Sequence, residues 1–261
     1  MAEASAIRLA PLWPMIAAQA RSEFFRLIRV PAFSIPVIAF PIMFYALFGL
    51  PSAHEHIDGI AVGSYVLASF GAYAVINVAL FSFGITVAND RGSKTTLLMR
   101  ATPLSPFAYL VGKTIATLVF SAIAISALFV FAAVTGGIQL QPLLWLTLSA
   151  KLLLGVFPFI TLGFAIGYLA GPNSAAAILQ LISLPMSFAS GLFVPVDDLP
   201  AFVRSIAPYL PAYHFGQLAW GAMGAPVEPI ATTILWLAGF TAMFAAVALR
   251  AYYREEAKSF G

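Results

Sequence analysis

Hydrophobic residues dominate five long stretches of this 261-residue chain, and charged residues gather in the short segments between them. No Asp, Glu, Lys or Arg occurs within residues 30–54, 59–89, 114–150, 152–196 or 229–249. About 20 apolar residues are enough for a helix to cross a bilayer. Each stretch can therefore span a membrane at least once.

Turn signals divide the two longest stretches. Gly171-Pro172-Asn173 interrupts residues 152–196, and Gly136-Gly137 followed by Pro142 interrupts residues 114–150. The pattern therefore predicts an all-α polytopic membrane protein. Its six transmembrane helices are expected at 31–51, 60–88, 110–134, 143–170, 174–194 and 229–250.

The basic residues predict the orientation. Eleven of the thirteen Lys and Arg residues lie before the first predicted span, between the second and third, or after the sixth. Cytoplasmic loops are enriched in basic residues, so we expect a multi-pass protein of the cell (inner or plasma) membrane with both termini cytoplasmic. The acidic loops, which contain Glu55, Asp58, Asp197, Asp198 and Glu228, then face outward.

The whole chain is expected to form a single transmembrane domain, 1–261. It comprises a cytoplasmic amphipathic helix within 1–30, a six-helix membrane domain at 31–250 and a cytoplasmic tail at 251–261.

The composition excludes several classes of protein. Hydrophobic residues make up 61% of the chain and charged residues 9%, whereas soluble domains have about 25% charged residues. A net charge of +3 leaves no basic patch for nucleic acid. The chain has no cysteine, no acidic residue inside the predicted spans and no residues with metal-ligand spacing. We therefore expect no metal site, proton relay or bound cofactor on this chain.

Two lysines lie close to predicted spans. Gly112-Lys113-Thr114 lacks the earlier glycine of a phosphate-binding loop, so we interpret Lys113 as an anchor at the inner face. Lys151 lies about 13 Å from the outer end of the fourth span, at 1.5 Å per residue. It either extends to the outer interface or faces a transport path and binds an anionic substrate.

Residues 12–30 have the pattern of an amphipathic helix. Glu23, Arg26 and Arg29 belong to its polar face, together with Gln19 and Ser22. The apolar face comprises Trp13, Ile16, Ala17, Ala20, Phe24, Leu27 and Ile28. Such a helix lies in the headgroup layer, where Arg26 and Arg29 would face anionic lipid. It is either a passive anchor or a contact for a cytoplasmic partner.

The outer segment 197–213 predicts a short helix over 199–207. Asp197 or Asp198 can cap it, and Pro200 suits its first turn. An apolar stripe follows, and Pro208 and Pro211 end it; the stripe comprises Leu199, Phe202, Val203, Ile206 and Leu210. The helix would lie on or dip into the outer leaflet, and a simple surface loop is the alternative.

The loop between the second and third predicted spans indicates a partner protein. It reads Asp90-Arg91-Gly92-Ser93-Lys94-Thr95, continues through Leu97-Leu98 to Arg100, and is closed by Pro103 and Pro106. This pattern favours a short helix exposed to the cytoplasm. A membrane protein with neither a proton relay nor a nucleotide site needs either no energy or the energy of a partner. The loop favours a partner, since such a helix is a natural docking element for a motor.

This loop, with the turn Thr102-Pro103-Leu104-Ser105, resembles the corresponding loop in the membrane subunit of type-2 ABC exporters. The stretch Gly191-Leu192-Phe193-Val194-Pro195, followed by Leu199-Pro200, is similar to the family's short re-entrant outer helices between spans five and six. The six spans and the amphipathic N-terminal helix extend the resemblance to nearly the whole chain.

The resemblance implies a permease subunit that forms a translocation path as a homodimer, or as a heterodimer with a similar permease. Separate ATP-binding cassette subunits would bind ATP and Mg, so this chain would not itself be an enzyme. The implied coupling residues are Asp90, Arg91, Gly92, Lys94, Thr95, Arg100, Arg26 and Arg29. The implied outer gate comprises Gly191, Phe193, Pro195, Leu199 and Pro200.

Candidates for the translocation path are Asn77, Ser82 and Thr86 on the second span, with Lys151 and Phe188. Hydrogen bonding within the protein is the alternative role of the first three. An apolar path favours a lipid, a lipid-linked molecule or a hydrophobic drug, and a polysaccharide remains open. The alternative function is an ATP-independent membrane channel or scaffold.

Overall fold

The computed structural model describes residues 11–57, 59–93 and 104–258, and most of these residues are helical. The N-terminal part comprises α1 (Leu12–Ile28), α2 (Pro31–Phe48), the two-residue strands β1 (His56–Ile57) and β2 (Ile60–Ala61), and α3 (Val62–Gly92). The middle comprises α5 (Pro106–Thr135), α6 (Pro142–Leu154), α7 (Phe157–Leu169) and α8 (Pro172–Ala189). The last part comprises α9 (Ala201–Ile206), α10 (Pro211–Trp220) and α11 (Ile230–Lys258), with short 3-10 turns at Val196–Asp198 and Ala207–Tyr209.

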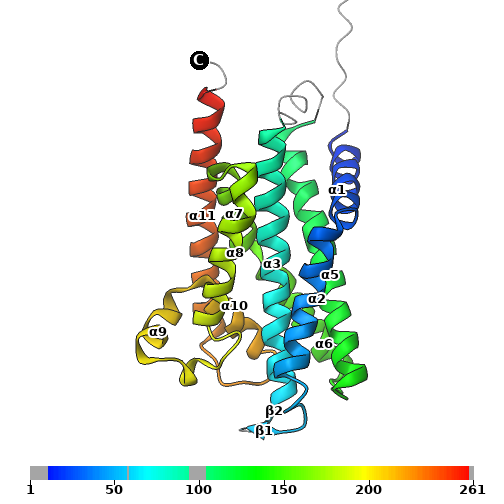
Figure 1. The fold of residues 1–261 in the computed structure, drawn as a ribbon, viewed down its shortest axis with the longest axis vertical. Coiled ribbons are helices and arrows are strands. Elements are labelled where there is room, and N and C mark those ends of the chain that lie inside the picture. Colours follow the sequence, from blue (N-terminus) through cyan, green and yellow to red (C-terminus); the bar gives the residue numbers. More distant parts are fainter. Residues whose placement is uncertain (1–10, 58, 94–103, 259–261) are drawn as a thin grey trace, which may run out of the picture.

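The long helices run side by side along the long axis of the molecule (Figure 1). The start of α1, the end of α3, the start of α5 and the end of α11 share one end, which we call the basic end. The antiparallel β1–β2 hairpin, α9 and α10 lie toward the opposite end, which we call the hairpin end (Figure 1). Helix α1 therefore begins, and helix α11 ends, at the same end of the molecule, so the two helices run in opposite directions.

Proline and serine residues fix several helix starts. Pro106, Pro142 and Pro172 each begin a helix, where the missing amide hydrogen costs nothing. The Ser105 hydroxyl also accepts a hydrogen bond from the Ala108 amide at 3.1 Å and caps α5. The predicted boundaries of the third, fourth and fifth apolar segments therefore lie within a few residues of those observed.

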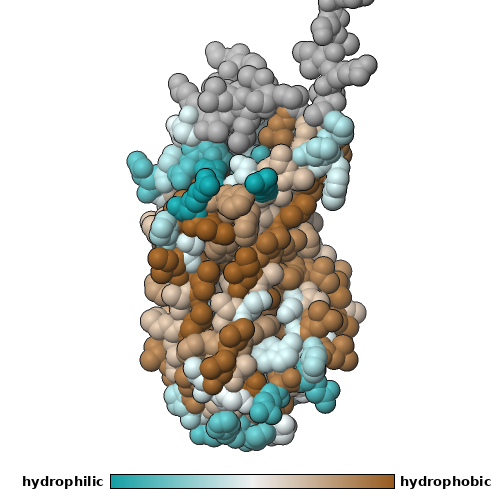
Figure 2. Space-filling model, turned by 90° about the vertical axis from the view of Figure 1, so that its right-hand side faces the viewer, coloured by the Kyte–Doolittle hydropathy of each residue, from teal (hydrophilic) through white to brown (hydrophobic). Residues whose placement is uncertain are grey.

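Within the part of the chain that the structure describes, five helical segments are long and apolar enough to cross a membrane: Pro31–Phe48, Val62–Gly92, Pro106–Thr135, Pro142–Leu169 and Ile230–Glu255. A broad hydrophobic belt lies between more polar ends on the face shown in Figure 2. The chain is therefore an all-α multi-pass membrane protein. The predicted fifth span corresponds to α8, which is not among the five because Asn173, Gln180 and several serines reduce its mean hydropathy.

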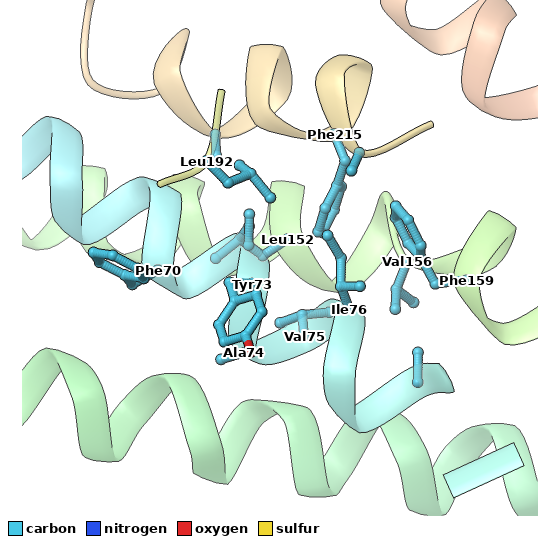
Figure 3. Close-up of a cluster of buried hydrophobic side chains, with 14 of the residues drawn as sticks. Phe70, Tyr73, Ala74, Val75, Ile76, Leu152, Val156, Phe159, Leu192 and Phe215 are labelled. Carbon is cyan, nitrogen blue, oxygen red and sulfur yellow. The ribbon is translucent and has the colours of Figure 1, made fainter. Parts of the chain in front are cut away.

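Helix α3 forms the centre of the bundle. Its side chains Phe70, Tyr73 and Ile76 belong to one buried apolar cluster, which also includes Leu152, Val156 and Phe159 of the α6–α7 segment and Phe215 of α10 (Figure 3). Because lipid is as apolar as these side chains, helices within a membrane are held together mainly by close van der Waals packing. The α3 helix therefore contacts most of its neighbours directly, and the partly exposed helices surround it.

Gly163 permits the closest approach between α3 and α7. A methyl group at Gly163 would lie 2.8 Å from the Leu80 carbonyl oxygen. We expect Gly163→Ala to destabilise the fold by about 1–2 kcal/mol, because overpacking forces the backbones apart. Gly239→Ala in α11 is the control, since nothing lies within 4 Å of the added methyl group and alanine favours helix. Thermal unfolding in detergent measures both, and equal effects would contradict the close packing.

The predicted faces of the N-terminal helix need correction. Helix α1 packs along the first turns of α5, with Gly112 against Gln19. Its buried side chains are Ile16, Glu23 and Leu27, whereas Trp13 is 73% exposed. Glu23 was assigned to the polar, outward face, and this is wrong because a basic side chain of α5 compensates its charge.

The outer segment also differs from the prediction. The short helix α9 occupies only Ala201–Ile206. Pro211 was predicted to end a helix but instead begins α10, which is buried against α3, α6 and α11. Helix α10 was not predicted from the sequence, although proline is common in the first turn of a helix.

Candidate functional site

A buried ion pair joins α1 to α5 at the basic end. The Lys113 Nζ lies 3.0 Å from the Glu23 Oε2, and the two residues are 1% and 4% exposed. The ammonium also lies 5.1 Å from the ring centre of Tyr109 and 5.9 Å from that of Phe83. Lys113 was expected to be an anchor at the inner face, and this is wrong because Glu23 and the two rings hold it inside the protein.

A second ion pair joins α1 to α3. The Arg26 Nη2 lies 2.7 Å from the Asp90 Oδ1, and the Tyr109 hydroxyl donates to the other Asp90 oxygen at 3.1 Å. Arg26 also lies 3.7 Å from Glu23. Two bases and two acids thus form one neutral cluster, which we call the three-helix charge cluster: Glu23, Arg26, Asp90 and Lys113. Because a buried charge is costly without its partner, the cluster fixes α1 against both α3 and α5.

Arg91 of α3 contacts two other helices. Its Nη1 donates to the carbonyls of Gly167 at 2.7 Å and Ala170 at 3.2 Å, at the end of α7. Its Nη2 lies 2.5 Å from the Glu255 carboxylate of α11, and its guanidinium lies 5.3 Å from the Tyr168 ring centre. A cation at a helix carboxyl end is favourable. Arg91 therefore connects the end of α3 to α7 and α11.

Among the described residues, the predicted coupling residues differ in their exposure and contacts. Asp90 is 4% exposed, and Arg26 and Arg91 point their charges at other helices. Arg29 is exposed and its guanidinium lies over the Phe25 ring. Gly92 ends α3 against Pro172. Lys94, Thr95 and Arg100 lie outside the described residues.

A groove of about 320 Å³ runs between α2, α3 and α8. It is mostly apolar, and its polar side chains include Asn77 of α3 and Gln180 of α8. Gln180 is exposed, and none of the hydrogen bonds between described residues involves it. The groove thus places two amides beside apolar walls at the depth of the membrane-spanning helices.

The three polar path candidates of α3 differ in their surroundings. The Asn77 amide accepts a hydrogen bond from Ser183 of α8 at 2.9 Å and donates to the Tyr73 carbonyl at 2.8 Å. Ser82 instead lies 2.9 Å from the Thr117 hydroxyl of α5, and the Thr86 hydroxyl bonds the Ser82 carbonyl. Among the three, only Asn77 lines the groove.

Phe193 lies within an aromatic cluster toward the hairpin end. Its ring centre is 4.2 Å from that of Phe188, 5.0 Å from Phe44 and 4.9 Å from Tyr73. Gly191 has a φ of +87°, a conformation that favours glycine, and turns the chain after α8. Thus Phe188 and Phe193, both named as candidates from the sequence, contact each other, and Phe193 also contacts α2 and α3.

The remaining predicted residues lie near α9 and α10. Pro195 precedes the turn Val196–Asp198, and Leu199 and Pro200 link it to α9. Lys151 of α6 lies near the end of α10, since a methyl group on Gly221 would be 3.9 Å from its Nζ. Among the residues that the structure describes, no group of three or more potential metal ligands comes together.

Comparisons with known proteins identify the family. The sequence model described as "ABC-2 family transporter protein" matches residues 56–250. The chain is also 29% identical over 202 residues to a Bacillus subtilis (strain 168) protein named "Putative transport permease YvfS", covering 77% of this chain and 82% of that protein. The match includes every helix from α3 to α10 and most of α11. The chain therefore belongs to the ABC-2 family of transporter proteins and is an ABC transporter permease of the membrane.

Proposed function

We propose that this permease is the membrane subunit of an ATP-driven exporter and works with a separate ATP-binding cassette subunit that binds ATP and Mg. The protein would reside in the inner or plasma membrane of the cell. Its basic end would face the cytoplasm, because basic residues are enriched on the cytoplasmic side. The three-helix charge cluster carries this proposal. It connects α1 to α3 and α5 beside the α3–α5 loop, where a motor would dock.

The cluster supplies a route for coupling. A force on α1 would move α3 and α5 with it. Separating Lys113 from Glu23, or Arg26 from Asp90, would leave a buried charge without its partner, which is energetically costly. Helix α3 lines the groove and contacts Phe193 through Tyr73. Movement at the basic end would therefore reach the path and the aromatic cluster.

We further propose that two permease subunits enclose the path, each contributing its α2–α3–α8 groove. An amide that faces hydrocarbon without a partner costs several kcal/mol. Gln180 is such an amide in the single chain. A second copy would give it a partner, and a similar permease in a heterodimer would do the same. The apolar walls favour a lipid, a lipid-linked molecule or a hydrophobic drug, with polysaccharide as a further candidate.

Cysteine cross-linking tests this arrangement directly, because the natural chain has no cysteine. We expect Gln180→Cys to form a disulfide-linked dimer in native membranes when mild oxidant is added. Leu235→Cys on α11, where the side chain is 73% exposed, is the matched control and should remain monomeric. A dimer through the α11 cysteine but not through position 180 would contradict the proposed path.

A further inference from the structure

A second cavity, of about 620 Å³, lies toward the hairpin end. The start of α3, the segment from Gly191 to Asp198, and α10 enclose it, and it shares no lining residue with the α2–α3–α8 groove. Small-molecule sites have volumes of about 300–1,000 Å³. We call it the outer cavity, and its size suits a compact ligand.

Aromatic side chains form one side of the outer cavity. The rings of Tyr65 and Trp220 stack with centres 5.3 Å apart and planes at 11°. The Trp220 indole also donates to the Ser69 hydroxyl at 2.8 Å, and Trp220 is only 3% exposed. These contacts hold both rings in place. The faces of such rings attract cations.

The charged side chains that line the outer cavity are Asp197 and Asp198, and no Lys, Arg or His lines it. Both carboxylates are exposed, and neither takes part in an ion pair among the described residues. Arg204 is close by but donates to the main-chain oxygen of Asp197, at 3.4 Å. Among the described residues, no ion pair neutralises the two carboxylates at this cavity.

Tyr213 gives a second indication of negative potential. Its side chain lines the cavity and its hydroxyl donates to Glu228 at 3.3 Å. Burial raises the pKa of Tyr213, and the nearby carboxylates of Glu228 and Asp197 raise it further. Burial disfavours a charge of either sign, so the part of the pKa shift that comes from Glu228 and Asp197 is what indicates negative potential at the cavity.

We propose that the outer cavity binds an organic ammonium ion. Its charge would lie between the Asp197 and Asp198 carboxylates and the Tyr65–Trp220 rings, and its alkyl groups would contact the apolar walls. Aromatic faces beside carboxylates favour such an ion over a strongly hydrated metal ion. A dissolved amine and an aminophospholipid headgroup share this chemistry. The proposal concerns the permease alone and does not depend on coupling to ATP.

The test compares choline with its neutral isostere 3,3-dimethylbutan-1-ol, using purified chain in nanodiscs of phosphatidylglycerol. Titration by saturation-transfer NMR measures both. We expect choline to bind and Asp197→Asn with Asp198→Asn to raise its Kd at least tenfold. Glu55→Gln, an exposed acid that does not line the cavity, is the control and should leave the Kd unchanged. Equal binding of the two probes, or no effect of the double substitution, would overturn the proposal.

Two further arms examine the rings and the source of the ligand. Tyr65→Phe should keep choline binding, whereas Tyr65→Leu should weaken it several-fold because the ring face is lost. An equal loss in both variants would contradict the aromatic contribution. Repeating the titration in nanodiscs with phosphatidylethanolamine identifies the source. Competition indicates that the cavity takes lipid headgroups, and an unchanged Kd indicates a site for dissolved amines.

Discussion

Replacing Lys113 with Met while Glu23 remains is expected to destabilise the fold by about 3 kcal/mol, because the buried Glu23 carboxylate loses its closest cationic partner and keeps only the more distant Arg26. Glu23 is 4% exposed and its Oε2 has Lys113 as its close cationic partner, at 3.0 Å. Unfolding by heat or by SDS in detergent micelles, followed by circular dichroism, measures the change.

The double variant Lys113→Met with Glu23→Leu separates the loss of one charge from the loss of the pair. Replacing both members of a buried ion pair by apolar residues is often close to neutral. We therefore expect the double variant to recover most of the stability that Lys113→Met loses. If both variants were equally destabilised, shape rather than charge would hold α1 to α5, and the role of the cluster would be refuted.

Replacing Arg91 with Ala is expected to cost about 2–3 kcal/mol, since the charge-assisted hydrogen bonds of Arg91 are lost. The two carbonyls at the end of α7 and the Glu255 carboxylate would lose their shared donor. Arg91→Lys should recover only part of this, because one ammonium cannot reproduce the guanidinium fork. Arg254→Ala, at an exposed position of α11, is the control and should change stability little.

The same Arg91→Ala variant also tests the coupling proposal in the assembled transporter. Because Arg91 connects the end of α3 to α7 and α11, we expect its loss to leave the protein in the membrane but to abolish substrate-stimulated ATP hydrolysis. Stimulation equal to that of the natural complex would mean that the α3–α7–α11 contact takes no part in coupling.

The membrane-spanning part of the fold could be predicted from the sequence because uncharged runs and prolines mark it locally. Residues 31–51 were predicted as a helix and α2 occupies Pro31–Phe48; residues 110–134 correspond to α5 at Pro106–Thr135. The start of α10 could not be recognised from the sequence, because a proline such as Pro211 can either end one helix or begin the next. The sequence predicted six membrane-spanning helices, whereas five of the described helical segments are long and apolar enough to cross a membrane.

The charge cluster could not be predicted in the same way. Glu23 and Lys113 are 90 residues apart, and nothing in either local pattern indicates the other. An amphipathic helix with Glu23 and Arg26 resembles a helix with a polar outer face, although in this fold Glu23 pairs with Lys113 of α5 and Arg26 with Asp90 of α3. The signals available in the sequence were Lys113, which precedes one apolar run, and Asp90, which follows another. Their pairing with Glu23 and Arg26 depends on the tertiary structure.

Affinity purification of the tagged chain from its native membrane in mild detergent, with mass spectrometry and an ATPase assay of the eluate, tests the central proposal most directly. We predict a stoichiometric ATP-binding cassette subunit and vanadate-sensitive ATP hydrolysis. A clean oligomer of this chain, without an ATPase subunit and without hydrolysis, would contradict the ATP-driven exporter and favour an ATP-independent channel or scaffold.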